Sequence, residues 1–456
     1  MSAAASAAYG VAQPRTLGLG MCVALVVGNI IGMGIFALPA SLAPYGLNAV
    51  TGWLITLLGC TFITMTFAVL SRAFPHDDGP YAYTQRAFGD GAAFFVMWCY
   101  WVSTWVTNAT IAIAVVGYFT VFLPQLNSNP WLAPISALSL VWLFVAINAR
   151  GARAAGWVQV LTTILKLLPL LGVICLGIWI LFRHPAEYAR SVPPNRGSWS
   201  EVSSASTLAL YAMLGIECAT IPACRVRDPQ RTIPAATIIG AAVTALIYVS
   251  VSLIPMLLVP QKELAASSAP FADLFARVLG PASGKVLALF IIISGLGALN
   301  GWTLLLGEIT QGLSRHGRFP AVLARENSRG APMIAFVVTG IVASAMLLTN
   351  YDESISGGFT FMSVVVTATN IPMYFVCGLA IAVLVWRGNL PAGRRRALWW
   401  AVSGLCTAAY CVWASIGIGL RPLLYTLGLS AVGLPVYLTF GYLRRRAPVP
   451  GVVADQ

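Results

Sequence analysis

Long apolar stretches alternate with short polar segments along almost the whole chain. Each stretch is about 20 residues or longer, which is the length that an α-helix needs to cross the hydrocarbon core of a bilayer. The pattern predicts twelve such helices, at 17–41, 48–72, 91–123, 130–148, 156–182, 203–223, 233–259, 280–312, 332–349, 357–386, 397–419 and 422–443. We therefore expect an all-α polytopic membrane protein with one domain over 17–443 and short tails at 1–16 and 444–456.

The first stretch carries a strong signal for a helix break. Its segment VVGNIIGMGIFALP, residues 26–39, places Gly28, Gly32 and Gly34 in the middle and ends on Pro39. Glycine costs about 1 kcal/mol relative to alanine inside a helix, and freed backbone groups within a bilayer need protein or water as partners. We predict a break whose N–H groups suit a carboxylate and whose carbonyls suit an ammonium. The alternative is that the glycines only allow close helix packing.

The sixth stretch repeats this signal. In ALYAMLGIECATIPAC, residues 209–224, Gly215 stands in mid-helix, Glu217 follows it and Pro222 comes shortly after. Two interrupted helices that are five helices apart are typical of a five-plus-five inverted repeat with a substrate site between its halves. The halves would be 17–183 and 202–387, followed by two further helices over 397–443.

Composition and charge support the membrane interpretation. The chain is 58% hydrophobic and 9% charged, whereas a soluble domain carries about 25% charged residues. The formal net charge of +13 could suggest a nucleic-acid partner. However, most of the 27 Lys and Arg residues fall in segments that share one side if the N-terminus is cytoplasmic. The positive-inside rule therefore explains the charge without nucleic acid, and it predicts that both termini are cytoplasmic.

Other function classes lack the residues that they need. The nine cysteines form no metal-type pair such as CxxC, and all three histidines fall between the predicted spans. We expect packed free thiols, no metal and no cofactor. An enzyme would need clustered His, Cys or carboxylates within the spans, a channel would need rings of like polar residues, and a sensor would append a signalling domain. None of these patterns is present, and only ten residues follow Arg446.

Five motifs in one order carry a family resemblance. They are GNIIGMGIFALPASLA, DDGPYAYTQRAFG (77–89), WVTNATIA (105–112), GIECATIPACRVRDPQRTIPAA (215–236) and LNGWTLLLGEITQGLSRHGRFP (299–320). With these motifs the chain resembles the amino acid–polyamine–organocation superfamily, and within it the basic amino acid/polyamine antiporters, above all those that exchange arginine for agmatine. The resemblance implies alternating access across the inner membrane, broken first and sixth helices and a role in acid resistance. Neutral amino acid transport remains the alternative, and a homodimer remains open.

The resemblance also implies roles for individual residues. It places around the substrate Ile30, Gly32, Met33, Gly34, Ser103, Thr104, Asn108, Ile111, Leu214, Trp302 and Val365. It assigns gating to Tyr100, Tyr211, Glu217 and Met373. Chemistry supports two of these roles independently, because an indole face attracts a desolvated cation by about 2 kcal/mol and an amide carbonyl accepts from a guanidinium. The alternatives are a packed core indole for Trp302 and an interhelical hydrogen bond for Asn108.

Three ionisable residues fall within the spans, where charge is expensive and points to function. Glu217 would take up a proton or hold the gate through a tyrosine hydroxyl, and Glu308 would form a salt bridge with the basic loop at Arg315. Lys166 lies roughly 15 Å deep at 1.5 Å per residue, too far for its side chain to reach the membrane surface. Its ammonium resembles a substitute for the sodium ion of related symporters. We expect Lys166 to couple transport to protons, with an uninvolved lysine in a water-filled cavity as the alternative.

Met33 departs from the pattern of arginine/agmatine-exchanging members, which resembles GNxxGSG. The serine of that pattern donates to the substrate carboxylate, whereas a methionine thioether donates no hydrogen bond. We therefore predict that this chain discriminates less sharply between an amino acid and its decarboxylated amine.

Overall fold

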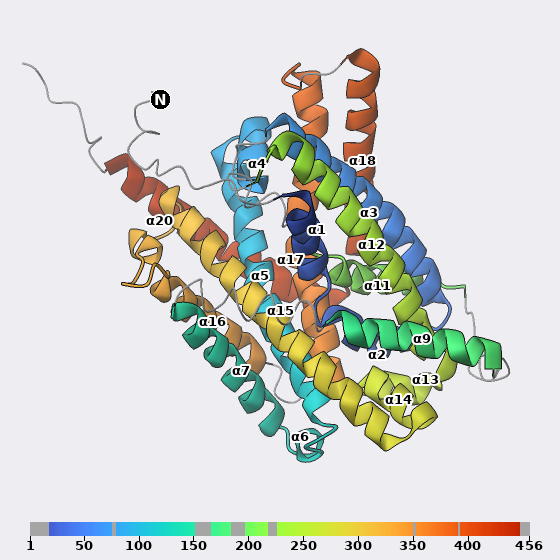
Figure 1. Cartoon of the computed structure of the whole chain (residues 1–456). Coiled ribbons are helices and arrows are strands. Elements are labelled where there is room, and N and C mark those ends of the chain that lie inside the picture. Colours follow the sequence, from blue (N-terminus) through green and yellow to red (C-terminus); the bar gives the residue numbers. More distant parts are fainter. Residues whose placement is uncertain are drawn as a thin grey trace, which may run out of the picture.

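The structure, a computed structural model, describes residues 18–74, 79–150, 166–183, 197–217, 226–349, 353–390 and 393–446. Every regular element in these ranges is a helix, as the apolar pattern predicts (Figure 1). The first part of the predicted fifth stretch and the last part of the sixth lie outside the described residues.

Eight spans in this part of the chain are long and apolar enough to cross a membrane. They are formed by α3 (Asn48–Ala73), α5 (Asp90–Phe119), α7 (Leu132–Ala149), α12 (Pro229–Leu258), α15 (Pro281–Arg315), α17 (Ile355–Trp386), α18 (Arg394–Ile416) and the consecutive pair α19 (Leu420–Ala431) and α20 (Gly433–Arg446). Each span matches a predicted stretch to within a few residues at either end.

The other four predicted stretches form shorter helices. These are α1 (Leu19–Ile30), α2 (Gly34–Leu42), α9 (Leu167–Arg183), α11 (Trp199–Ala212) and α16 (Met333–Leu348). The first stretch is divided into α1 and α2 at its glycines, as predicted. In the sixth stretch, α11 begins earlier than expected and ends at Ala212, so regular helix stops before Gly215.

Short helices mark the two ends of the bundle. At one end lies α4 (Pro80–Phe88), with the 3-10 helix η5 (Ala321–Ala324) following α15. At the other end lie η2 (Ala43–Tyr45), α6 (Gln125–Ser128), α13 (Gln261–Ala266) and α14 (Pro270–Leu279). Helix α5 begins beside α4 and ends beside α6 (Figure 1), so we name these the α4 end and the α6 end.

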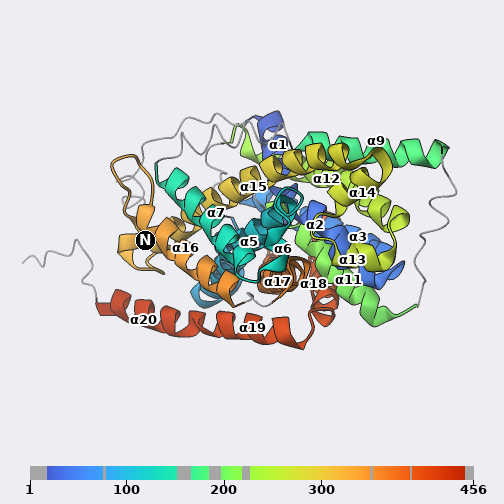
Figure 2. The ribbon, with the colours of Figure 1, turned by 90° about the horizontal axis from the view of Figure 1, so that it is seen from below.

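Helix α5 forms the centre of the bundle. Its residues are buried on every side from Val96 to Tyr118, as expected of a helix that is apolar all round. It packs against α15 and α17, and α17 in turn packs against α18. Viewed from below, α5 and α17 lie in the middle while α19 and α20 run in line along one edge (Figure 2). A site beside α5 is therefore surrounded by other helices.

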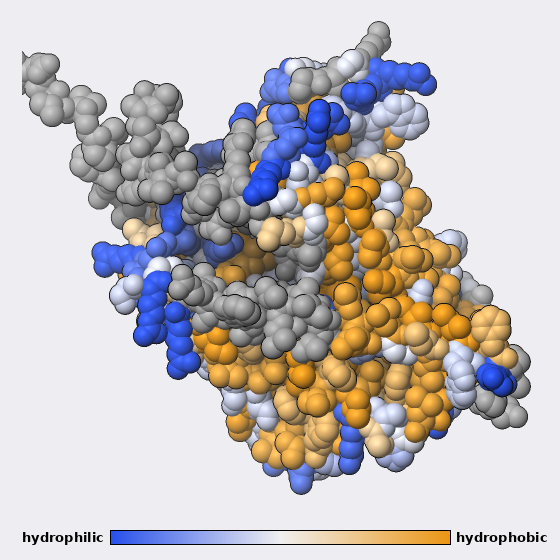
Figure 3. Space-filling model, viewed as in Figure 1, coloured by the Kyte–Doolittle hydropathy of each residue, from blue (hydrophilic) through white to orange (hydrophobic). Residues whose placement is uncertain are grey.

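The outer surface is apolar along the helices. Leu54 and Leu58 of α3 are each 60% exposed, and Leu246 of α12 is 74% exposed. Figure 3 shows apolar residues covering this flank, with hydrophilic residues gathered toward the end where α4 lies. Such an apolar surface suits contact with lipid tails. The helical backbone behind it also satisfies its hydrogen bonds internally, as a bilayer requires.

Candidate functional site

The break between α1 and α2 exposes backbone carbonyls that would normally continue a helix. The Ile31 N–H still bonds to Val27 O (2.8 Å), but the Gly32 N–H turns back to Ile30 O (2.8 Å) and ends the ladder. Residues 31–33 are non-helical, and α2 begins at Gly34. The carbonyls around this point therefore need other donors.

Side chains from two distant segments supply these donors. Lys166, directly before α9, donates from Nζ to Gly28 O (2.5 Å) and to Ile31 O (3.2 Å). Tyr248 of α12 donates from its hydroxyl to Ile30 O (2.6 Å). Lys166 is only 1% exposed, so its ammonium is held by carbonyls rather than by water. Sequence reasoning singled out Lys166 but missed Tyr248, whose only signal is a polar tip within an apolar helix.

The opposite side of the break presents N–H groups. Within the described part of the chain, the N–H groups of Met33, Gly34 and Ile35 take part in no backbone hydrogen bond. They form the first turn of α2, where the helix dipole adds partial positive charge. This is the arrangement that suits a carboxylate.

The second break follows α11. The Met213 N–H bonds to Leu210 O and the Leu214 N–H bonds to Tyr211 O, so the chain tightens into turns after Ala212. Gly215 then has φ +106°, a conformation that residues with a Cβ rarely adopt. The glycine that predicted this break is therefore required by the backbone, while residues 218–225 lie outside the described part.

A small cavity lies between the two breaks and α15. It has a volume of about 20 Å³, which is room for roughly one water molecule. Its lining includes seven residues predicted around the substrate, namely Ile30, Gly32, Met33, Gly34, Ile111, Leu214 and Trp302. The predicted gate residue Tyr211 also lines it, together with Thr107 and Ala212, which sequence reasoning did not select.

The remaining predicted substrate residues are buried nearby but do not line this cavity. Ser103 donates to Val366 O (3.3 Å) and accepts from Asn370 Nδ2 (3.3 Å), while Thr104 donates to Tyr100 O (2.8 Å). Val365 is fully buried within α17. The hydroxyls of Ser103 and Thr104 are thus engaged by helix backbone, which is a common arrangement for these residues in mid-helix.

Asn108 does not line the cavity either, but its side-chain oxygen is unpaired among the residues that the structure describes. It is 4% exposed, and within the described part of the chain its Oδ1 has no hydrogen-bond partner. Leaving a buried carbonyl unpaired costs about 1–3 kcal/mol, so a ligand that donates a hydrogen bond to it would recover that free energy. The alternative for Asn108, an interhelical hydrogen bond, is therefore not formed through this oxygen among the described residues.

A buried carboxylate joins three helical segments between the cavity and the α4 end. Tyr100 of α5 donates to Glu217 Oε1 (2.9 Å), and Tyr374 of α17 donates to Glu217 Oε2 (2.7 Å). All three residues are essentially unexposed. We call this cluster the inner gate. The resemblance pointed to Met373, but the contact comes from its neighbour Tyr374, because one step along a helix turns a side chain by about 100°.

Other contacts close the route toward the α6 end. Tyr118 donates to Phe36 O (2.7 Å), and Ser41 shares a hydrogen bond with Thr360 (2.7 Å). A Cβ added to Gly34 would lie 3.1 Å from the ring of Tyr211, so that ring packs directly onto the start of α2. Side-chain contacts among the described residues therefore lie on both sides of the cavity.

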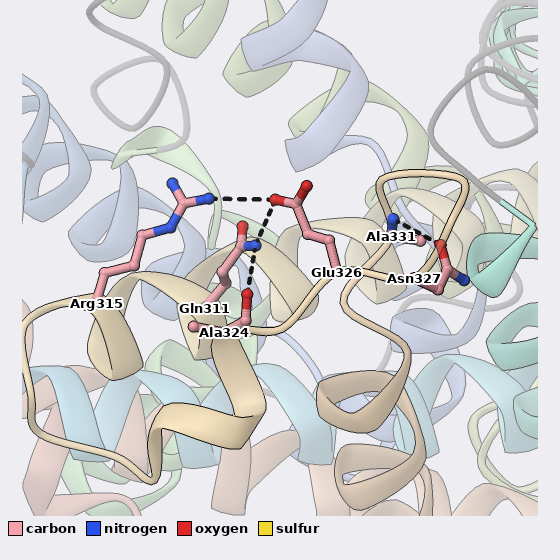
Figure 4. Close-up of polar contacts among 6 residues, drawn as sticks. All are labelled: Gln311, Arg315, Ala324, Glu326, Asn327 and Ala331. Atoms are coloured by element: carbon pink, nitrogen blue, oxygen red, sulfur yellow. Dashed lines mark hydrogen bonds and ion pairs between the residues drawn. The ribbon is translucent and has the colours of Figure 1, made fainter. Parts of the chain in front are cut away.

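Arg315, the last residue of α15, pairs with a carboxylate beyond the helix. Arg315 lies 3.2 Å from Glu326, whose carboxylate also accepts from Gln311 Nε2 (2.8 Å), as Figure 4 shows. Arg315 thus pairs with Glu326, and the salt bridge expected of Glu308 stays a prediction. Both Arg315 and Glu326 are substantially exposed, so this pair contributes little stability.

Comparison with known proteins gives the chain a family. The family model described as amino acid permease matches residues 17–435. The "Putative arginine/ornithine antiporter" of Bacillus subtilis is 30% identical, covering 93% of this chain and 97% of the relative. Two Escherichia coli K12 proteins, putrescine transporter PotE and the cadaverine/lysine antiporter, are 28% and 29% identical, covering 93% and 80% of this chain and 96% and 82% of their own lengths. The chain thus belongs to the amino acid permease family, among the basic amino acid/polyamine antiporters of the amino acid–polyamine–organocation superfamily.

Proposed function

We propose that the chain exchanges arginine for its decarboxylated amine, agmatine, across the inner membrane by alternating access. The observation that carries the proposal is the cavity at the break of the first helix, where an indole lies beside N–H groups that make no backbone hydrogen bond. The relatives that match the chain are named for cationic amino acids and polyamines. Their names support a cationic substrate.

The two ends of the substrate require different partners. Its carboxylate would bind the N–H groups of Met33, Gly34 and Ile35 at the start of α2, where the helix dipole favours an anion. Its guanidinium would stack on Trp302 and donate to the unpaired Oδ1 of Asn108. Agmatine lacks the carboxylate and would keep only the second set of contacts.

Substrate entry requires the helices to separate, because about 20 Å³ cannot hold an amino acid. The positive-inside rule makes the α4 end cytoplasmic. Opening toward the cytoplasm would then break the inner gate of Tyr100, Glu217 and Tyr374, and opening outward would move Tyr211 off Gly34. In this scheme Lys166 couples the state of the first break to protons.

Several broader predictions belong to the same proposal. The twelve-helix count, the five-plus-five repeat and the cytoplasmic placement of both termini remain predictions, and a homodimer remains open. The inverted repeat is supported by the two breaks, which lie on α1–α2 and directly after α11.

Proteoliposomes give the test. Purified protein is reconstituted with internal agmatine, with internal leucine or with no internal substrate, and uptake of radiolabelled arginine is followed. Of these three conditions, we expect only internal agmatine to give fast uptake of arginine. Equal stimulation by leucine would identify a transporter of neutral amino acids, and uptake that ignores the internal substrate would identify a uniporter. Either result would overturn the proposal.

A further inference from the structure

The side chain of Met33 occupies a space that exists only because residue 295 is glycine. A Cβ added to Gly295 of α15 would lie 2.6 Å from Met33 Sδ and 2.8 Å from Met33 Cγ. It would also lie 2.4 Å from Val115 Cγ2 on α5. Separations under about 3 Å are not tolerated between carbon atoms, so an alanine at 295 must displace a neighbour.

One face of helix α15 lies against the break between α1 and α2. Gly295, Ala298 and Trp302 are spaced by three and four residues, so they lie on that face. Gly295 contacts Met33, the Ala298 Cβ lies 3.8 Å from the position of a Cβ on Gly32, and Trp302 lines the cavity. The contact at Gly295 is therefore continuous with the substrate site.

Val115 must give way as well, but Met33 is the neighbour that can move farther. It is fully buried and already borders the cavity, and its unbranched side chain turns easily about three bonds. Val115 is β-branched and restricted on α5, so it moves less readily. Displaced from Gly295, the thioether would enter the cavity that it borders.

We propose that Gly295 determines substrate length by keeping the Met33 thioether out of the substrate space. The proposal rests on the proposed function for the nature of the substrate, but the pairing of Gly295 with Met33 can be measured without any ligand. A larger residue at 295 would shorten the site, whereas removing the thioether as well would restore it. Gly295 is thus a specificity-determining position that does not itself contact substrate.

The test compares Gly295→Ala, Met33→Ala and the double variant. Dissociation constants are measured in the full-length protein for a graded series of probes, the straight-chain diamines from two to six carbons. We expect Gly295→Ala to weaken binding of the longest diamine about tenfold more than that of the shortest, and the double variant to restore the wild-type ratio. An equal loss for all lengths would overturn the proposal.

Gly307 provides a matched control on the same helix. A Cβ there would lie 2.3 Å from Phe336 on α16, so Gly307→Ala overpacks the protein to a similar degree away from the cavity. We expect it to lower the unfolding midpoint without changing the ratio between long and short probes. If Gly307→Ala shifted the ratio of dissociation constants for long and short diamines as much as Gly295→Ala does, overpacking alone would explain the change in specificity.

A ligand-free measurement separates this proposal from the proposed function. If neither agmatine nor any diamine binds the wild type, the cationic substrate is wrong, and the series is repeated with straight-chain neutral amino acids from alanine to norleucine. In either case adding Met33→Ala should recover part of the unfolding midpoint lost in Gly295→Ala, while the part due to Val115 remains. If Gly295→Ala does not fold, folding of the double variant supports the pairing. A double variant no more stable than Gly295→Ala would overturn it.

Discussion

The ammonium of Lys166 donates across 2.5 Å to the carbonyl oxygen of Gly28, 138 residues earlier in the chain. The same ammonium reaches Ile31 O on the far side of the last helical turn. One cation thus satisfies two of the carbonyls that the break in the first helix leaves without a helical partner. The break and the buried charge explain each other, because neither is stable within a bilayer alone.

Replacing Lys166 should therefore affect both stability and coupling. Lys166→Ala leaves two buried carbonyls without a donor, at about 1–3 kcal/mol each, so the unfolding midpoint should fall. If Lys166 couples transport to protons, the variant should lose net uptake or show a flatter pH dependence while exchange continues. Uptake is measured across a pH series with and without internal substrate. Lys285→Ala, at an exposed lysine near the α6 end, is the control. Wild-type rates and pH profile in Lys166→Ala would refute the coupling role.

Trp302 should act through the face of its ring. Trp302→Leu should weaken binding of a cationic substrate by about 2 kcal/mol, or roughly thirtyfold, because the aliphatic side chain has no quadrupole. Trp302→Phe and Trp302→Tyr should retain part of the affinity. Isothermal titration measures the three dissociation constants, with Trp399→Leu on the exposed face of α18 as control. Equal losses in all three variants would indicate packing rather than stacking.

The inner gate should loosen when one phenol is removed. Tyr374→Phe deletes the hydrogen bond to Glu217 Oε2, which is worth about 1.5–3 kcal/mol if the carboxylate is charged. We expect preloaded proteoliposomes to lose substrate faster in the absence of external counter-substrate. Met373→Leu changes the adjacent residue without touching that bond. A leak of the same size in Met373→Leu would show that packing, rather than the hydrogen bond, closes the gate.

Met33 should influence the choice between amino acid and amine. Met33→Ser introduces a donor at the break, which is worth about 1.5–3 kcal/mol to a bound carboxylate, or about ten- to a hundredfold. The ratio of dissociation constants for arginine and agmatine should therefore shift toward arginine. The serine also leaves the space at Gly295 unfilled, so overall stability should fall, but a ratio of two ligands is insensitive to that loss. An unchanged ratio would mean that residue 33 does not reach the carboxylate.

The break in the first helix could be predicted because its cause is local. Gly32 and Gly34 weaken the helix wherever the chain folds, and the structure places the non-helical residues between Ile30 and Gly34. The apolar lengths likewise predicted the eight long spans. The division of the last span into α19 and α20 was not predicted; at this point Gly433 lies against the Trp98 ring of α5, a contact that sequence patterns do not reveal.

The details of the site depend on rotation about helix axes and on long-range contacts, which sequence patterns do not fix. Tyr374 instead of Met373 at Glu217 is a matter of one residue along α17. Thr104 was expected at the substrate, but its hydroxyl bonds to the carbonyl one turn earlier. The role of Tyr248 requires that α12 pack against α1, a contact that joins residues far apart in sequence.

The smallness of the cavity also has an electrical consequence. With room for about one water molecule and contacts on both sides, the closed bundle offers ions no conducting column through the described helices, so the membrane potential falls across the protein itself. Each elementary charge moved through that field is worth about 2.3 kcal/mol per 100 mV. Arginine carries one net positive charge and agmatine carries two, so under the proposed exchange every turnover would export one charge. A membrane potential held negative inside would then oppose this export of positive charge and slow exchange. Removing the potential would make exchange faster.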